Sequence, residues 1–295
     1  MSAEPKDISA SLSHSRSNAA ARPEPDPLVL VEYLLHLADS ALILGHRLSE
    51  WTGHGPILEQ DIAISNIALD LIGQARYLYQ HAAKLIMAMD AKSIARPHFL
   101  PASEPLTEDS LAYLRDAGDF RNSLLVEQPN GDWARTTLRQ FYFSAFQFYL
   151  FRHLQTSLDQ QLAAIAEKSS KEIAYHLRWS SEWVIRLGDG TQESHRRMQV
   201  ACADLEKYLP ELFRPAAYEM LAAQAGLAVD PSGLREPWLR EVRRVFEEAG
   251  LSGALPDLAR YSPHEAGKQG RHSEALGYVL AEMQFLQRAY PRCEW

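Results

Sequence analysis

The sequence has 295 residues, and 30 Lys and Arg against 38 Asp and Glu give it a formal net charge of −8 at pH 7. This charge excludes a general nucleic-acid-binding protein, because contacts to phosphates require a concentrated excess of Lys and Arg. Apolar residues make up 46% of the chain, which is enough to bury a sizeable core and excludes disorder throughout.

The two cysteines, Cys202 and Cys293, lie far apart in the sequence. They share no Cys-x-x-Cys spacing, so the sequence predicts no structural zinc site, iron–sulfur cluster or disulfide framework. Residues 1–27 are rich in Ser, Ala, Pro and charges and lack the apolar segment of a secretory signal, so we expect a disordered tail. No run approaches the roughly 20 uninterrupted apolar residues that span a bilayer. We therefore expect a cytoplasmic protein that does not cross a membrane.

From Leu28 onward, apolar residues recur with a period near 3.6, which predicts a succession of helices and no parallel sheet. The Gly- and Pro-containing string "WTGHGP" separates the first two long helices. A Pro-bearing connection and a short helix precede two further long helices. The expected helices of this part are residues 28–50, 57–89, 107–117, 132–157 and 159–187.

Four long antiparallel helices predict an all-α fold with a four-helix bundle over residues 28–187. Further helices near 192–208, 215–225, 235–249 and 272–289 are expected to wrap around the bundle, which gives a single domain over residues 28–295. The helix at 132–157 carries aromatic side chains on several faces, which could line a substrate pocket or fill the core. Core packing is the favoured interpretation. These aromatic residues are Phe141, Tyr142, Phe143, Phe146, Phe148, Tyr149 and Phe151.

A bundle of this kind raises the hypothesis of a di-iron centre, which takes a Glu from each of two helices and a Glu-x-x-His pair from each of the other two. Residues three apart face the same way on a helix, so the carboxylate can bridge two metals while the His nitrogen holds one. None of the 11 histidines has Asp or Glu three residues before it. The required pair is therefore absent from the sequence.

What remains is a degenerate cluster of polar residues on the long helices. Glu172 and His176 are four residues apart on the fourth long helix, Asp70 lies on the second and Asp39 on the first. They could form an unusual metal site, or a buried polar cluster whose members satisfy one another by hydrogen bonds. We favour the second interpretation and expect neither a catalytic residue nor a metal ligand in this chain. Two other pairs at the same spacing are expected on a solvated face and at a loop entrance, respectively: Glu32 with His36, and Glu50 with His54.

The string "EAGKQGRHSEALG" carries Lys268, Arg271 and His272 just before a predicted helix, where Gly267 and Gly270 free the backbone. Cationic side chains at a helix N-terminus suit an anion such as a substrate phosphate. The alternative, a solvated turn that only begins a helix, is favoured. The sequence has no Gly-x-Ser-x-Gly elbow, Walker A loop or dinucleotide fingerprint, so an autonomous hydrolase, kinase or dehydrogenase is not expected.

Four segments give the chain its resemblance to a known family, and their order is specific to it. They resemble the PaaC family, the C subunits of the bacterial ring-1,2-phenylacetyl-CoA epoxidase, over about residues 28–295. The resemblance implies a ferritin-like fold and a cytoplasmic multicomponent oxygenase that converts phenylacetyl-CoA to its ring epoxide in aerobic phenylacetate breakdown. The segments are "HRLSEWTGHGPILEQDIAISNIALDLIGQARYLYQHAA", "DFRNSLLVEQPNGDWARTTLRQF", "KEIAYHLRWSSEWVIRLGDGT" and "GKQGRHSEALGYVLAEMQFLQRAYP".

The resemblance also implies a division of labour. In that family the di-iron centre belongs to the related A subunit, the C subunit is a structural partner without the metal ligands, and a flavin and iron–sulfur reductase supplies electrons. It thus implies no cofactor here, and partnership with the A subunit in a heterodimer or higher heteromer, with the other epoxidase subunits and with the reductase. Phenylacetyl-CoA would lie near the interface, with Lys268, Arg271 and His272 as candidate phosphate contacts. The alternative to a structural subunit is a protein that acts alone, namely a self-sufficient di-iron or iron-binding ferritin-like protein with an atypical site.

Overall fold

The computed structural model describes residues 26–89, 105–262, 266–290 and 293. Within those ranges the regular structure consists of helices, with no strand, which confirms the all-α prediction. The predicted tail lies, up to residue 25, outside the described residues.

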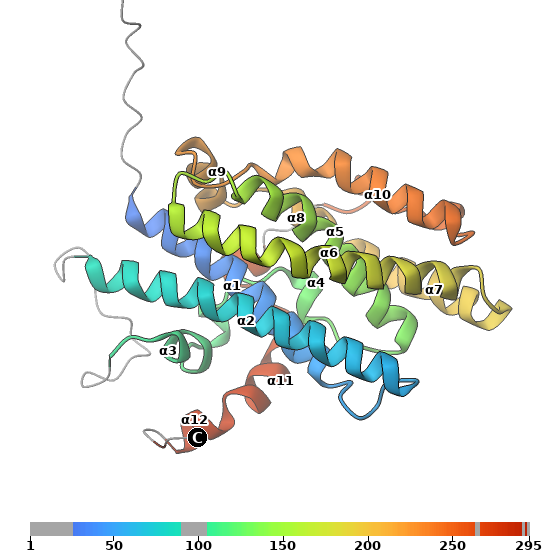
Figure 1. The fold of residues 1–295 in the computed structure, drawn as a ribbon, viewed down its shortest axis with the longest axis horizontal. Coiled ribbons are helices and arrows are strands. Elements are labelled where there is room, and N and C mark those ends of the chain that lie inside the picture. The colour runs from blue at the N-terminus through green and yellow to red at the C-terminus, as the bar shows by residue number, and fades with distance from the viewer. Residues whose placement is uncertain (1–25, 90–104, 263–265, 291–292, 294–295) are drawn as a thin grey trace, which may run out of the picture.

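Two antiparallel helical hairpins form the bundle (Figure 1). The first consists of α1 (Pro27–Ser49) and α2 (Leu58–Ala88), and the second of α5 (Trp133–Leu154) and α6 (Gln160–Gly188). Contacts between α2 and α6 join the two hairpins. The observed ends of these helices lie within three residues of those predicted from the sequence.

Local signals in the sequence set the starts of three of these helices. In each, an Asp at the N-cap accepts a hydrogen bond from a backbone N–H of the first turn and so satisfies a donor that the helix leaves unpaired. Pro27 occupies the first position of α1, where its missing N–H costs nothing. The capping pairs are Asp26 with the N–H of Leu28, Asp132 with that of Arg135, and Asp159 with that of Leu162.

Helix α1 is by length and composition apolar enough to cross a membrane, which the search for uninterrupted apolar runs did not predict. However, 78% of its most apolar window is buried inside the structure. It packs against α2 and, on other sides, against α4 (Leu124–Glu127), α9 (Ala217–Gln224) and α11 (Glu274–Met283). A helix enclosed on several sides is apolar on several faces, so packing within the protein accounts for the composition of α1.

The described part of the connection between the hairpins, residues 105–132, packs against α2 through α3 (Glu108–Tyr113) and against α1 through α4. The predicted helix at 107–117 corresponds to the shorter α3, which is followed by the 3₁₀ turn η1 (Ala117–Asp119) and by α4. Arg115, between α3 and η1, is almost completely buried.

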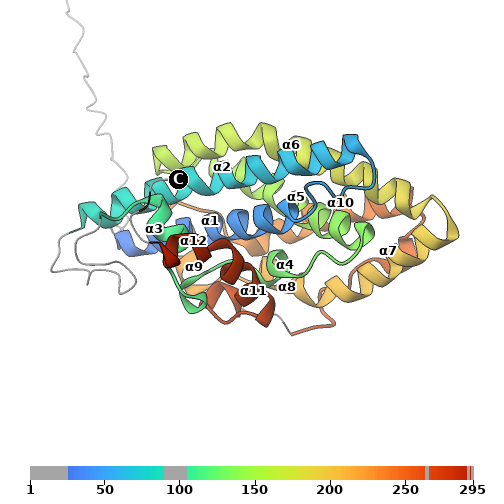
Figure 2. The same cartoon turned by 90° about the horizontal axis from the view of Figure 1, so that it is seen from below.

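The C-terminal third of the chain covers both hairpins. Helices α7 (Gln192–Leu205) and α10 (Arg235–Glu248) pack against α5 and α6. Helices α9 and α11 pack against α1, and α11 also contacts α4 (Figure 2). The predicted helix at 272–289 is in fact two helices, α11 and α12 (Phe285–Ala289). The remaining short helical elements are α8 (Pro210–Phe213), η2 (Glu206–Tyr208), η3 (Pro231–Leu234), η4 (Ser252–Ala254) and η5 (Gly267–Gln269).

Five of the seven aromatic residues predicted to fill the core are buried there, and the other two, Phe148 and Tyr149, are half-buried against it. Phe141 and Tyr142 are fully buried and contact Phe246 of α10, and Tyr142 also contacts Trp238. The indole N–H of Trp238 donates to the carbonyl oxygen of Tyr142 over 2.9 Å. This aromatic cluster attaches α10 to the second hairpin.

Replacing Trp238 by Ala should lower the free energy of unfolding by about 3–5 kcal/mol, because the substitution opens a cavity in the core. The control is Tyr278→Ala on α11, where the side chain is 68% exposed and the expected change is within about 0.5 kcal/mol. Urea unfolding of the two variants measures the difference, and equal stabilities would contradict this account of the core.

Candidate functional site

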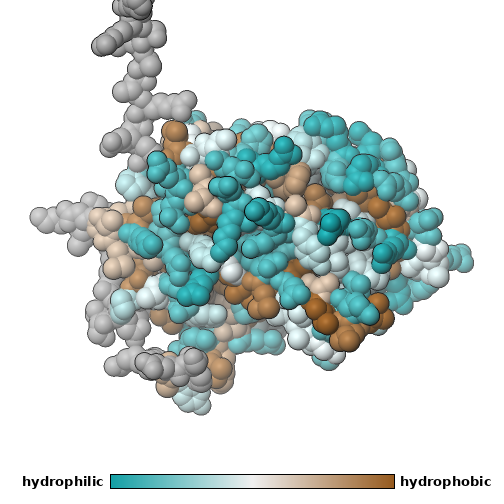
Figure 3. Space-filling view, viewed as in Figure 1, coloured by the Kyte–Doolittle hydropathy of each residue, from teal (hydrophilic) through white to brown (hydrophobic). Residues whose placement is uncertain are grey.

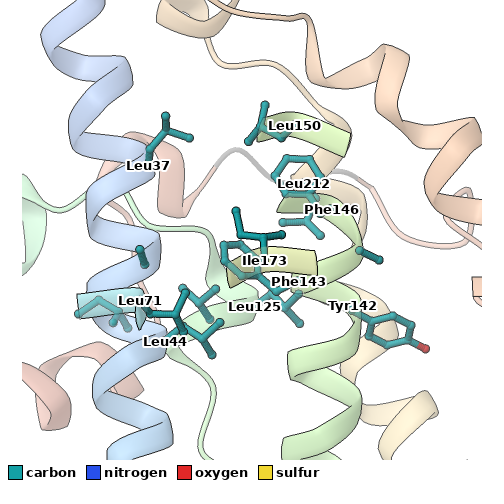
Figure 4. Close-up of a cluster of buried hydrophobic side chains, with 14 of the residues drawn as sticks. Leu37, Leu44, Leu71, Leu125, Tyr142, Phe143, Phe146, Leu150, Ile173 and Leu212 are labelled. Carbon is teal, nitrogen blue, oxygen red and sulfur yellow. The ribbon is translucent and has the colours of Figure 1, made fainter. Parts of the chain in front are cut away.

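Apolar side chains fill the middle of the four-helix bundle. Leu44 of α1, Leu71 of α2 and Ile173 of α6 converge there, together with Leu125 and with Phe143 of α5 (Figure 4). Each of these side chains is at most 3% exposed. In a di-iron bundle the inward positions carry the metal-binding carboxylates. Here the side chains that meet in the middle of the bundle are apolar and cannot bind a metal ion.

Asp39, predicted to belong to a cluster with Asp70, lies in a different network. Its carboxylate forms a buried ion pair with Arg115, whose Nη1 donates to Oδ2 over 3.1 Å. The hydroxyl of Tyr79 donates to Oδ1 over 2.5 Å, and the backbone N–H of Arg121 donates to Oδ2 over 2.7 Å. Burial is the largest single influence and lowers the pKa of Arg115, but the charge and hydrogen bond of Asp39 together with the charges of Tyr79 and Asp119 outweigh it, and the net pKa is raised. The charge of Asp39 is thus balanced by a guanidinium.

The other three predicted residues lie between α2 and α6. The Nε2 atom of the fully buried His176 is 3.0 Å from Oδ2 of Asp70, whose side chain is 36% exposed. One turn away, Nε2 of Gln74 donates to Oε2 of Glu172 over 2.9 Å. Glu172 and His176 therefore each reach across to α2, in two neighbouring cross-helix contacts.

These contacts correct the predicted cluster of four. Asp39 does not join it, and Glu172 and His176 each contact a residue of α2. The cluster is also not closed: Nδ1 of His176 and Oε1 of Gln74 are buried and have no hydrogen-bond partner among the described residues. Spacing along one helix indicated a shared face, but which helix each side chain reaches depends on how the helices pack.

The residues present do not fit a di-iron centre. Such a centre takes about six protein ligands, four of them carboxylates. In residues 26–89, 105–262, 266–290 and 293, no three His, Cys, Asp or Glu side chains come together in a group that could hold a metal ion. Asp39, the most deeply buried of the predicted carboxylates, is already neutralised by Arg115.

The prediction that Lys268 contacts a phosphate is wrong. Its side chain is fully buried, and Nζ lies 2.8 Å from Oε2 of Glu219 and donates to the carbonyl oxygen of Arg214 over 3.0 Å. The backbone N–H of Gly267 donates to Oε1 of Glu211 over 2.9 Å. The turn therefore uses its cation and its backbone donors to bind carboxylates of the same chain.

His272 is likewise engaged inside the protein. Its Nδ1 is 2.8 Å from Oε2 of Glu127, and its Nε2 is 3.0 Å from the carbonyl oxygen of Phe120. Burial is the largest single influence and lowers the pKa of His272, but the hydrogen bond and charge of Glu127, with the carbonyl group of Phe120 and the charge of Asp39, together outweigh it, and the net pKa is raised. Arg271 is exposed and contacts Gln269, so its proposed contact with a phosphate stays a prediction. The favoured alternative, a solvated turn, is also wrong for Lys268 and His272, although helix α11 does begin after this turn.

The sequence prediction for the Glu32 and His36 pair was half right. Glu32 is exposed, but His36 is buried, with Nδ1 2.7 Å from the carbonyl oxygen of Arg121 and Nε2 3.6 Å from Oε1 of Glu219. Burial is the main cause of its lowered pKa. The second pair, Glu50 with His54, is exposed at the loop after α1, as expected.

Three buried carboxylates were missed by the sequence analysis: Glu127, Glu211 and Glu219. Each is at most 2% exposed. A signal was present, because Glu127 follows the apolar string "SLLV" and Glu211 lies within "LPELF". A charged residue inside a short apolar segment points to a buried charge that needs a partner.

Comparison with known proteins places this helical architecture in a family. Residues 15–295 match the family described as phenylacetic acid catabolic protein, which covers PaaA and PaaC. The chain belongs to this family, and its fold is the ferritin-like helical fold. It is 44% identical over 266 residues to the C subunit of the 1,2-phenylacetyl-CoA epoxidase of Escherichia coli strain K12. The matched region covers 90% of this chain and 99% of the Escherichia coli protein.

Replacing Arg115 by Met should lower the free energy of unfolding by about 3–5 kcal/mol, because it leaves the charge of Asp39 buried and unpaired. The control is Arg76→Met, which breaks a pair between the 66% exposed Arg76 and Glu108 and should cost at most about 1 kcal/mol. Adding Asp39→Asn to Arg115→Met should recover part of the loss. Chemical unfolding of the three variants tests this, and an Arg115→Met variant as stable as Arg76→Met would contradict it.

The pair of His272 and Glu127 should make stability depend on pH. Because the folded protein holds the His272 proton more tightly than the unfolded chain, the contribution is complete below the ordinary pKa of 6.5 and is lost as pH rises through the higher folded-state pKa. The stability difference between wild type and His272→Gln should therefore be largest near pH 6 and shrink toward alkaline pH.

Urea unfolding of both proteins at several pH values measures this difference. His54→Gln, which replaces an exposed histidine, is the control and should change stability little throughout. A difference for His272→Gln that stays constant or grows with pH would show that the pair is not held in its charged form.

Proposed function

We propose that this chain is the structural, non-catalytic C subunit of a cytoplasmic phenylacetyl-CoA 1,2-epoxidase, paired with a di-iron A subunit in aerobic phenylacetate breakdown. The relative from Escherichia coli bears the name of the C subunit of that enzyme, and the match extends over nearly the whole of it. Such a name implies an assembly of several chains. In this proposal the A subunit supplies the iron, and a separate flavin and iron–sulfur reductase supplies the electrons.

The observation that carries the non-catalytic role is the packing at the bundle centre. Leu44, Leu71 and Ile173 meet there, and the nearby carboxylate of Asp39 is bound by Arg115. A reaction centre needs polar groups that converge on a space where substrate can sit. Here the buried charge of Asp39 is paired with Arg115, and apolar side chains occupy the space between the helices.

The alternative, a self-sufficient di-iron or iron-binding protein, would need a different donor set. His176 and Asp70 place two possible metal ligands, one nitrogen and one carboxylate, side by side between α2 and α6. Glu172 contacts Gln74 and does not join them as a third ligand. No observation in the described part of the chain favours this second function.

Iron analysis of the separated subunits tests the proposal. The A subunit and this chain are co-expressed, loaded with iron under anaerobic conditions, and separated under mild denaturation for metal determination. We expect iron with the A subunit and none at stoichiometric level with this chain. Two irons per copy of this chain, or epoxidation of phenylacetyl-CoA by this chain without the A subunit, would overturn the non-catalytic role.

A His176→Ala variant provides the matching functional measurement. The substitution removes the histidine from its contact with Asp70 and should lower the melting temperature of this chain. The assembled complex should keep its kcat within about twofold, because no reacting group has been removed. A complex that assembles with unchanged stability and has lost epoxidation would make this pair catalytic.

A further inference from the structure

A small cavity lies inside the protein, where α1, α5, α8 and the turn at η5 meet. Each side chain that lines it is at most 5% exposed. Apolar residues form most of its wall, and Figure 4 shows three of them, Leu37 on α1 with Phe146 and Leu150 on α5. The space open to the centre of a water molecule is about 10 Å³, which is the room that one water molecule needs.

The depth of this cavity matters for the polar groups in its wall. At the surface, hydrophilic and hydrophobic side chains are mixed, as over the N-terminal end of α2 at the lower right of Figure 3, and water reaches a polar atom there from outside. A buried polar atom instead needs a partner inside the protein, because leaving it unpaired lowers stability. Each polar side chain of the wall therefore has to be accounted for.

Two polar side chains of the wall have an atom without a partner. Oε1 of Gln147 on α5 and Oγ of Ser123, the residue before α4, are buried and have no hydrogen-bond partner among the described residues. An amide oxygen only accepts a hydrogen bond, whereas a hydroxyl group both donates and accepts. One small molecule that can donate and accept would satisfy both atoms.

His36 of α1 also lines the cavity. Its Nδ1 is 2.7 Å from the carbonyl oxygen of Arg121, and because a carbonyl oxygen only accepts, Nδ1 carries the proton. Burial is the main cause that lowers the pKa of His36 below 6.5, so the ring is neutral at pH 7 and Nε2 is an acceptor. Oε1 of Glu219, 3.6 Å from Nε2, is an acceptor too and does not satisfy it.

The remaining polar side chains of the wall, Ser40 and Lys268, already have partners. Oγ of Ser40 accepts from the backbone N–H of Ser123 over 3.2 Å. Nζ of Lys268 is bound by Glu219 and by a backbone carbonyl oxygen. The groups left to bind a molecule in the cavity are therefore those of Gln147, Ser123 and His36.

We propose that this cavity is a binding site for one internal water molecule, which donates to Oε1 of Gln147 and Nε2 of His36 and accepts from the hydroxyl group of Ser123. Three hydrogen bonds are the usual number for a buried water molecule. The water connects α1, the segment before α4 and α5, so it joins the two hairpins through polar contacts. This site is independent of the function proposed above.

A crystal structure of the full-length wild-type chain, at a resolution that shows ordered water, is the direct test. We expect one water molecule in the cavity, about 3 Å from Ser123 Oγ, Gln147 Oε1 and His36 Nε2. An empty cavity, or a water molecule that contacts neither Ser123 nor Gln147, would overturn the proposal. This measurement requires no variant, so it remains decisive if a substitution in the core prevents folding.

The solution test compares the number of long-lived internal water molecules, counted by ¹⁷O relaxation dispersion, in wild type and in the double variant Gln147→Met with Ser123→Ala. The variant replaces two of the three polar groups by apolar ones and should contain one such water fewer. The matched control is Gln155→Met with Ser170→Ala, which changes the same residue types in an exposed pair and should leave the number unchanged. Circular dichroism establishes that both variants are folded. A folded double variant with the wild-type number would contradict the site.

The ¹⁵N chemical shifts of labelled histidine test the role of His36 separately. At pH 7 we expect a neutral ring with its proton on Nδ1 and with Nε2 accepting a hydrogen bond. A doubly protonated ring at this pH would donate directly to Glu219, and it would overturn the three-bond site.

Discussion

A carboxylate buried in an apolar helical bundle must find a cation or several donors, and this requirement organises much of the structure. Leaving a buried charge without its partner costs about 3–5 kcal/mol, a large share of the net stability of a domain, so each such group is matched. Asp39 is held by Arg115, Tyr79 and a backbone N–H. Glu219 is held by Lys268, and Glu127 by His272 with Ser273.

These pairs join segments that are far apart in the sequence. The pair of Asp39 and Arg115 fixes the irregular connection between the hairpins against α1, and the pair of Glu127 and His272 fixes the start of α11 against α4. Lys268 attaches the C-terminal turn to α9. Breaking any one of them leaves a charge without a partner, so the C-terminal third of the chain is bound to the bundle by electrostatics as well as by apolar contact.

The buried ion pairs also bear on the proposed function. The interior of this bundle is filled by packed apolar side chains and ion pairs, so the proposed function assigns the contribution of the chain to an epoxidase to its surface. Helix α2 has both environments, because Ile64, Leu71 and Leu78 lie in the core, whereas Leu58, Ile62 and Leu69 are exposed.

The sequence by itself determined the four long helices, their ends and the family. Apolar periodicity, Asp caps and Gly or Pro at the ends act through residues close in the chain, so they can be read without a structure. The absence of Glu-x-x-His is likewise a property of local spacing. Only the tertiary structure decided the partners of the polar residues. Asp39 pairs with Arg115 and Lys268 with Glu219 because the packing of segments that are distant in the sequence decides which side chains meet, and spacing along one helix does not specify this packing.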